Sequence, residues 1–205
     1  MPEVSATVTR RDELLAIAAR LFAERGFKNT TVRDIADAAG ILSGSLYHHF
    51  DSKEAMVDEL LDSFQQSLWQ QYDAIESSDS TPREKLEAVV RVSFDAIDQH
   101  HSEVAIFQTD AAFLATFDRF AYLEERNIRF RDLWTGLLTE GVASGELRSD
   151  LNVELVYRFL RDTVWVAVRW YRPGGELSPE QVADQYLHIL LDGISTGSIT
   201  EGDHV

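Results

Sequence analysis

The 205-residue sequence contains no cysteine, which excludes a disulfide framework and any zinc site built on thiolates. No run of apolar residues approaches the 18 or so that a membrane-spanning helix requires. The first residues also lack the apolar core of a signal peptide, so we expect a cytoplasmic protein with no membrane partner. Basic residues are scarce, because 19 lysines and arginines stand against 35 acidic residues and the net charge is -16.

The acidic excess lies in one part of the chain. Residues 1–53 hold seven basic and seven acidic residues, so the whole charge of -16 falls on residues 54–205. DNA phosphates would be repelled by the acidic part but not by the neutral N-terminal part. With 44% apolar residues, the chain can build the core of one large or two small domains.

Apolar residues recur at helical spacing along most of the chain, and no pair of strands is evident. Capping residues such as Asn152 and Ser178, and breakers such as Gly26 and Gly145, mark the helix ends. The sequence therefore predicts an all-α protein with nine helices. The first ends near Arg25, and the third begins at Ser43; the others span about residues 31–39, 52–76, 82–99, 103–115, 119–144, 152–171 and 178–195.

Residues 30–53 read TTVRDIADAAGILSGSLYHHFDSK, which has the pattern of a helix-turn-helix that reads DNA. Thr31 and Asp34 form a capping box at the start of its first helix. The chain reverses in about three residues from Gly40, and Ser43 can cap the second helix. Small residues, Gly44 among them, would let the helices cross closely, and Ile35, Leu42, Leu46 and Phe50 would form the core beneath.

The N-terminal residues of a recognition helix reach base edges, so the hydroxyls of Ser43 and Ser45 are candidate base contacts. Tyr47 and His48 are better placed for phosphates or thymine methyl groups, although Tyr47 could instead pack on the next helix. Lys53 at a helix start suits a phosphate. The candidate DNA-binding residues are Arg10, Arg11, Thr31, Ser43, Gly44, Ser45, Tyr47, His48 and Lys53.

Some of these residues have an alternative interpretation. Arg10 and Arg11 could be ordinary solvated charges rather than phosphate contacts. His48 and His49 are not expected to bind a metal, because adjacent helical positions point about 100° apart. We therefore predict no metal site and no cofactor.

The order T-T-V-R-D-I-A-x-A-A-G, S-G-S-L-Y-H-H-F and S-K-E, over residues 10–60, resembles the N-terminal domain of the tetracycline-repressor (TetR) family of bacterial transcription regulators. The resemblance implies an all-helical homodimer that leaves a palindromic operator when it binds a small-molecule inducer. The expected parts are a disordered arm (1–8), a helix-turn-helix domain (9–55), a ligand-binding and dimerisation domain (56–197) and a disordered tail (198–205).

The last two helices carry more large apolar side chains than a peripheral pair can bury alone. A four-helix interface between two copies would cover the surplus and would place two recognition helices on a palindrome. The expected interface residues are Leu155, Phe159, Val166, Trp170, Tyr186, Leu187, Leu190 and Leu191.

Arg161, Trp165, Arg169 and Arg172 are spaced by four, four and three residues, which predicts one helix face. Guanidinium groups beside an indole suit an amphipathic anion such as an acyl-coenzyme A thioester, although salt bridges within the acidic protein are an alternative. The candidate ligand-binding residues are Arg161, Trp165, Arg169, Tyr122, Arg126, Phe64, Leu68, Phe107 and Phe113, of which the phenylalanines and Leu68 could equally be core.

The segments GILSGSLYHHFDSKE and YRFLRDTVWVAVRWYRPGG further resemble the branch of this family that represses ketosteroid degradation in actinobacteria. That likeness implies control of sterol-ring catabolism by a coenzyme A thioester of a ring-derived propanoate. Alternatives are an activator, or a regulator of fatty-acid or xenobiotic genes with an uncharged apolar effector. We expect no enzyme and no catalytic residue, because the G-x-S-x-G string at residues 193–197 lacks a preceding strand.

Overall fold

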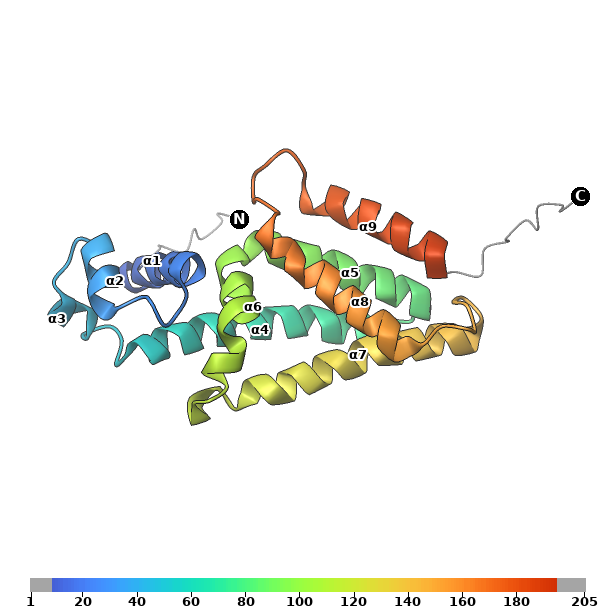
Figure 1. Cartoon of the computed structure of the whole chain (residues 1–205), viewed down its shortest axis with the longest axis horizontal. Helices are drawn as coiled ribbons and strands as arrows, with labels where there is room; N and C mark the ends of the chain where they lie inside the picture. Colours follow the sequence, from blue (N-terminus) through green and yellow to red (C-terminus); the bar gives the residue numbers. More distant parts are fainter. Residues whose placement is uncertain (1–8, 195–205) are drawn as a thin grey trace, which may run out of the picture. The chain divides into compact units, whose positions relative to one another are not determined.

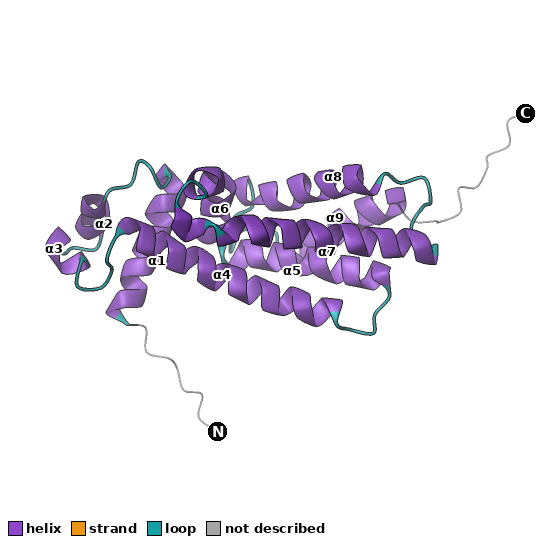
Figure 2. Cartoon of the chain, turned by 90° about the horizontal axis from the view of Figure 1, so that it is seen from below, coloured by secondary structure: helices purple, strands orange, loops and turns teal. Residues whose placement is uncertain are grey.

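In the computed structural model, which describes residues 9–194, the described chain forms nine α-helices and two short 3₁₀ helices and has no strand (Figures 1 and 2). This confirms the predicted all-α fold. The predicted arm and tail, residues 1–8 and 198–205, lie outside the described residues. The elements are α1 (Arg10–Arg25), α2 (Val32–Ala38), α3 (Ser43–Leu46), α4 (Lys53–Glu76), α5 (Pro82–Gln99), α6 (His101–Leu114), η1 (Asp118–Phe120), α7 (Tyr122–Ser144), α8 (Val153–Trp165), η2 (Val166–Arg169) and α9 (Pro179–Ile194).

The described chain falls into two compact units. The first comprises the described part of Met1–Ser67 together with His100–Leu123, and the second comprises Leu68–Gln99 with the described part of Glu124–Val205. Helix α4 contributes residues to both units. Packing therefore groups α6 with the helix-turn-helix, whereas the sequence placed it with the ligand-binding domain. None of the described helices is both long and apolar enough to cross a membrane.

In the first unit, α1 packs against α2 and α6 through a face that includes the buried Leu14, Ala18 and Phe22. The predicted capping box at α2 is present: the Thr31 N–H donates to the Asp34 carboxylate at 2.8 Å, and the Asp34 N–H donates to the Thr31 hydroxyl at 3.1 Å. The Thr31 hydroxyl also donates to the Asp34 carboxylate, and this bond together with that from the Thr31 N–H holds the pKa of Asp34 below its usual range.

Helix α3 is shorter than predicted, and Ser43 is not its cap. The N-cap residue is Leu42, whose extended backbone lacks a side-chain capping bond. Leu42 is 80% exposed, so its predicted place in the core is wrong. The reason is the turn: Ile41 donates its N–H to the Ala36 carbonyl and packs on the core, which turns its neighbour outward. A Cβ on Gly44 would meet nothing within 4 Å, so no close helix crossing requires glycine there.

In the second unit, α5 lies along α9 and also contacts α8 (Figure 1). An aromatic cluster forms beside them, centred on Phe130 of α7. The Phe130 ring centroid lies 5.5 Å from Trp134, 6.0 Å from Trp165 and 6.2 Å from Tyr72. The buried hydroxyl of Tyr72 shares a 2.7 Å hydrogen bond with Ser93, and burial raises the pKa of the phenol.

Helix α8 ends at Trp165 rather than at the predicted Tyr171. The chain tightens into η2, and the Tyr171 hydroxyl donates to Asp98 at 2.6 Å. A 3₁₀ helix turns by about 120° per residue, so Arg169 is rotated away from the face it would share with Arg161 in an α-helix. The predicted arginine and tryptophan stripe is therefore broken at its C-terminal end.

Helix α7 carries two glycines in different surroundings. A Cβ placed on Gly141 would lie 2.7 Å from Cδ1 and 2.9 Å from Cγ of Leu147, which is 1% exposed. The Leu147 N–H also donates to the Gly141 carbonyl at 2.9 Å, which keeps the two residues close. A Cβ on Gly136 would meet nothing within 4 Å.

We expect opposite effects when each glycine is replaced by alanine. Gly136→Ala should raise the free energy of unfolding by about 0.5–1 kcal/mol, because glycine is a poor residue within a helix. Gly141→Ala should lower it by about 1–3 kcal/mol, because the added methyl overpacks against Leu147. Urea unfolding followed by circular dichroism measures both, and equal stability of the two variants would contradict the close approach.

Candidate DNA-reading site and effector region

The predicted recognition residues, in α3 and directly after it, are accessible at the surface. Tyr47 is 56% exposed, His48 and Gly44 are exposed, and Ser43 and Ser45 are half-buried. Beneath them, Leu46 and Phe50 are buried and fix the short helix to the core of the first unit. Thr31, at the start of α2, is also exposed, although its hydroxyl is bonded to Asp34. Direct contact of these residues with DNA stays a prediction.

Lys53 is held by the protein itself. Its ammonium donates to the carbonyls of Phe27 at 2.7 Å and of Thr30 at 2.9 Å, and it lies 4.1 Å from the centroid of the Phe27 ring. Burial lowers the pKa of Lys53. Two of its three N–H donors thus secure the connection between α1 and α2. This role accounts for a lysine at the start of a helix even if it binds no phosphate. Its contact with phosphate stays a prediction.

Arg10 and Arg11 also make contacts within the first unit. The Arg11 guanidinium binds the Glu59 carboxylate through two hydrogen bonds, raising the pKa of Arg11, and lies 4.5 Å from the centroid of the Phe50 ring. Arg10 donates to the Ala39 carbonyl at 2.9 Å. Both side chains therefore tie α1 to the residues around α2, α3 and α4.

Asp110 of α6 supports the helix-turn-helix, a role that the sequence did not predict. Its carboxylate is buried and accepts the Phe27 N–H at 2.9 Å. The missed signal was its spacing, because Asp110 lies four residues from both Ile106 and Leu114, which are fully buried. Together, Asp110 and Lys53 hold the N–H and the C=O of the same residue, Phe27.

Asp110→Ala leaves the buried Phe27 N–H without its acceptor, so we expect the free energy of unfolding to fall by about 1–3 kcal/mol. Asp118→Ala removes an exposed acid of the same unit and should change it by less than about 0.5 kcal/mol. Chemical denaturation followed by circular dichroism compares the two variants. Equal stabilities would show that the Asp110 carboxylate does not support this loop.

The predicted ligand-binding residues are divided between the two units. Phe64, Phe107, Phe113 and Tyr122 belong to the first unit, and Leu68, Arg126, Arg161, Trp165 and Arg169 belong to the second.

Several of those in the first unit have structural contacts there. Phe107 and Phe113 pack on the core beneath the helix-turn-helix, and the Phe113 ring lies 6.3 Å from Phe27. Phe64 is buried, with its ring 5.5 Å from His100. The Tyr122 hydroxyl donates to Asp58 at 3.0 Å. This packing favours the core role for the three phenylalanines.

In the second unit, Trp165 is only 6% exposed and belongs to the aromatic cluster around Phe130. Arg161 is exposed, and its Nε donates to Asp162 at 2.7 Å, which raises the pKa of the guanidinium. Leu68 is buried, Arg126 is half-buried on α7, and Arg169 is exposed on η2. The indole N–H of Trp134, a residue that the sequence did not single out, is buried without an acceptor among the described residues.

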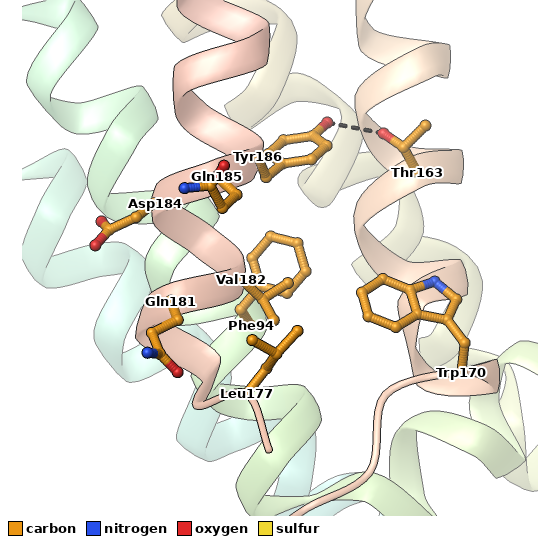
Figure 3. Close-up of a pocket in the computed structure, with 9 residues that line it drawn as sticks. All are labelled: Phe94, Thr163, Trp170, Leu177, Gln181, Val182, Asp184, Gln185 and Tyr186. Atoms are coloured by element: carbon orange, nitrogen blue, oxygen red, sulfur yellow. Dashed lines mark hydrogen bonds between the residues drawn. The ribbon is translucent and has the colours of Figure 1, made fainter. Parts of the chain in front are cut away.

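Helices α8 and α9 border an open pocket of about 590 Å³ (Figure 3). The Thr163 and Tyr186 hydroxyls lie 2.7 Å apart across one end, and burial raises the pKa of Tyr186. Figure 3 shows the exposed ring of Trp170 facing Val182 and Leu177 across the other end.

The apolar surface of α8 and α9 differs in part from the predicted dimer interface. Leu155, Phe159 and Trp170 are exposed as predicted, and Val166, Tyr186 and Leu190 are half-buried. Leu187 and Leu191 are buried within their own unit, so they support this surface from beneath. Leu177 and Ile189 are 55% and 75% exposed and extend the apolar surface beyond the prediction.

Two family models match the chain. The model described as "Bacterial regulatory proteins, tetR family" matches residues 14–60, and "Tetracyclin repressor-like, C-terminal domain" matches residues 79–194. The second alone covers more than half of the chain, and the first contains α2 and α3.

Relatives of known role match over most of their length. The transcriptional repressor KstR2 of Rhodococcus jostii is 60% identical over 91% of this chain and 92% of its own, and that of Mycobacterium tuberculosis is 56% identical over 91% and 94%. The solved structure of the ketosteroid transcriptional regulator KstR2 of Mycobacterium tuberculosis matches with a TM-score of 0.90, at 54% identity, over 93% of this chain and 97% of that one. AibR, 24% identical with a TM-score of 0.75 over 88% and 97%, shares the fold.

Proposed function

The chain belongs to the TetR family of bacterial regulatory proteins, and from this premise we propose that it is a cytoplasmic transcriptional repressor that binds a palindromic operator as a homodimer. The observation that carries the proposal is the set of accessible side chains in α3 and directly after it, Ser43, Ser45, Tyr47 and His48, on a segment without net charge. Hydroxyl and aromatic side chains there can contact base edges and phosphates in the major groove. The similarity to the KstR2 repressors supports repression rather than activation.

Dimerisation is supported by the apolar surface of α8, η2 and α9. Phe159, Trp170 and Ile189 are each more than half exposed on it, which is costly in water unless a partner covers them. A two-fold axis through this surface buries the same residues of both copies. It also duplicates α3, as a palindromic operator requires.

For the inducer, we propose a coenzyme A thioester from steroid-ring breakdown. The aromatic cluster around Phe130 and the unaccepted Trp134 N–H could serve the apolar body and a carbonyl of such a ligand. The exposed guanidinium of Arg161 would bind its phosphates. The similarity to the ketosteroid regulator KstR2 supports the steroid part, and AibR, which shares the fold, was solved with isovaleryl coenzyme A and operator DNA.

Tyr47→Ala should weaken operator binding at least about tenfold, a loss of about 1.4 kcal/mol, while the protein remains a dimer. A mobility-shift titration measures the affinity, and sedimentation checks the dimer. Transcription from the same fragment should fall with the natural protein and fall less with the variant at equal concentration. Unchanged affinity would remove Tyr47 from the interface, and a rise in transcription with the natural protein would identify an activator.

The decisive experiment titrates the protein–operator complex with a panel of coenzyme A thioesters and free coenzyme A. Arg161→Ala should bind the operator normally but need about tenfold more steroid-derived thioester for release, because a hydrogen bond to a charged group contributes about 1.5–3 kcal/mol. Arg158→Ala, with the same charge change one turn away, is the matched control and should release like the natural protein. Equal behaviour of both variants would remove Arg161 from the effector site.

A further inference from the structure

The start of α3 lacks the residue type that stabilises a helix start. The neighbouring helices have such a residue. The hydroxyls of Thr9 and Thr31 cap α1 and α2, and the Ser52 hydroxyl accepts the Ala55 N–H at 3.0 Å at the start of α4. At α3 the cap position is occupied by Leu42, which provides no acceptor. Serine, threonine or aspartate is strongly preferred at this position, so leucine here weakens the helix.

Leu42 does not contribute to the core either, because it is 80% exposed. The neighbouring Ile41 packs on the core, and Leu46 and Phe50 anchor the far end of α3. A single exposed leucine is ordinary on a protein surface. This one, however, takes a place where a polar residue would strengthen α3, so neither the helix nor the core accounts for it.

We propose that Leu42 is a specificity-determining residue that contacts the C5-methyl group of a thymine in each operator half-site. The inference rests on the proposed DNA-binding function. The N-terminal end of a recognition helix is the part that reaches base edges, and Leu42 directly precedes Ser43 at that end. Thymine alone among the four bases presents a methyl group in the major groove, where an apolar side chain distinguishes it. Contact would remove both apolar groups from water and so favour the leucine.

The test uses a duplex operator selected from a random pool by the full-length protein. Symmetric pairs of thymines are replaced by deoxyuridine, which lacks only the methyl group, and affinities are measured for the natural protein and for Leu42→Ser. A buried methyl contributes about fourfold in affinity, so two half-sites give about 15-fold. We expect the natural protein to lose about that much at one symmetric pair. Leu42→Ser should bind the thymine and deoxyuridine duplexes of that pair equally.

Two further variants separate contact from folding. Leu42→Met keeps an apolar side chain without a capping group, so it should retain the deoxyuridine sensitivity even where Leu42→Ser is altered. Ile128→Ser changes another exposed apolar residue, 56% exposed on α7, and should keep the full loss.

The outcomes separate the role of Leu42 from DNA binding itself. Sensitivity that persists in Leu42→Ser, or no sensitive thymine in any half-site, would overturn the role of Leu42 while leaving DNA binding intact. Failure of the full-length protein to select any duplex would instead overturn the proposed function.

Discussion

The helix-turn-helix depends on the two hydrogen bonds that hold Phe27. Its N–H is bound by the Asp110 carboxylate of α6 and its carbonyl by the Lys53 ammonium of α4. Hydrogen bonds to charged groups are strong, and a buried backbone group that loses its partner bears the full cost of its desolvation. The connection between α1 and α2 is therefore fixed by two helices that follow it in the sequence, α4 and α6, and α2 and α3 begin from a fixed point.

Because Lys53 lies at the start of α4, the position of α4 affects the loop from which α2 and α3 begin. Helix α4 continues past Ser67 into the second unit, so one unbroken helix carries Lys53 at its start and residues of the other unit at its end. A helix transmits a shift along its axis, because its hydrogen bonds resist stretching. A displacement of α4 would move the Lys53 ammonium from the Phe27 and Thr30 carbonyls, and the Arg11–Glu59 pair would move with it.

The sequence predicted what is local in the chain. The capping box of Thr31 and Asp34 and the ends of α1 and α5 follow from residues a few positions apart, and these predictions were confirmed. It could not decide which of Ile41 and Leu42 faces the core, since both are apolar and the turn between the helices sets the choice. The partners of Lys53, Arg11 and Asp110 lie 23 to 83 residues away, so their roles require the folded chain.

The basic residues of the first unit differ in how readily they could bind a DNA phosphate. If Arg11 or Lys53 turned to bind a phosphate, it would lose the contacts that hold the first unit together. The free energy lost would be larger than that of breaking an exposed ion pair. The Arg33–Asp37 pair is 3.7 Å apart with side chains 85% and 69% exposed, so it can exchange its partner for phosphate at little cost. Arg20 is also exposed on α1. With few such cations, phosphate contacts and counterion release would supply a modest part of the affinity. On the proposed function, we expect base contacts from the residues at the N-terminal end of α3 to supply the remainder of the affinity together with the selectivity.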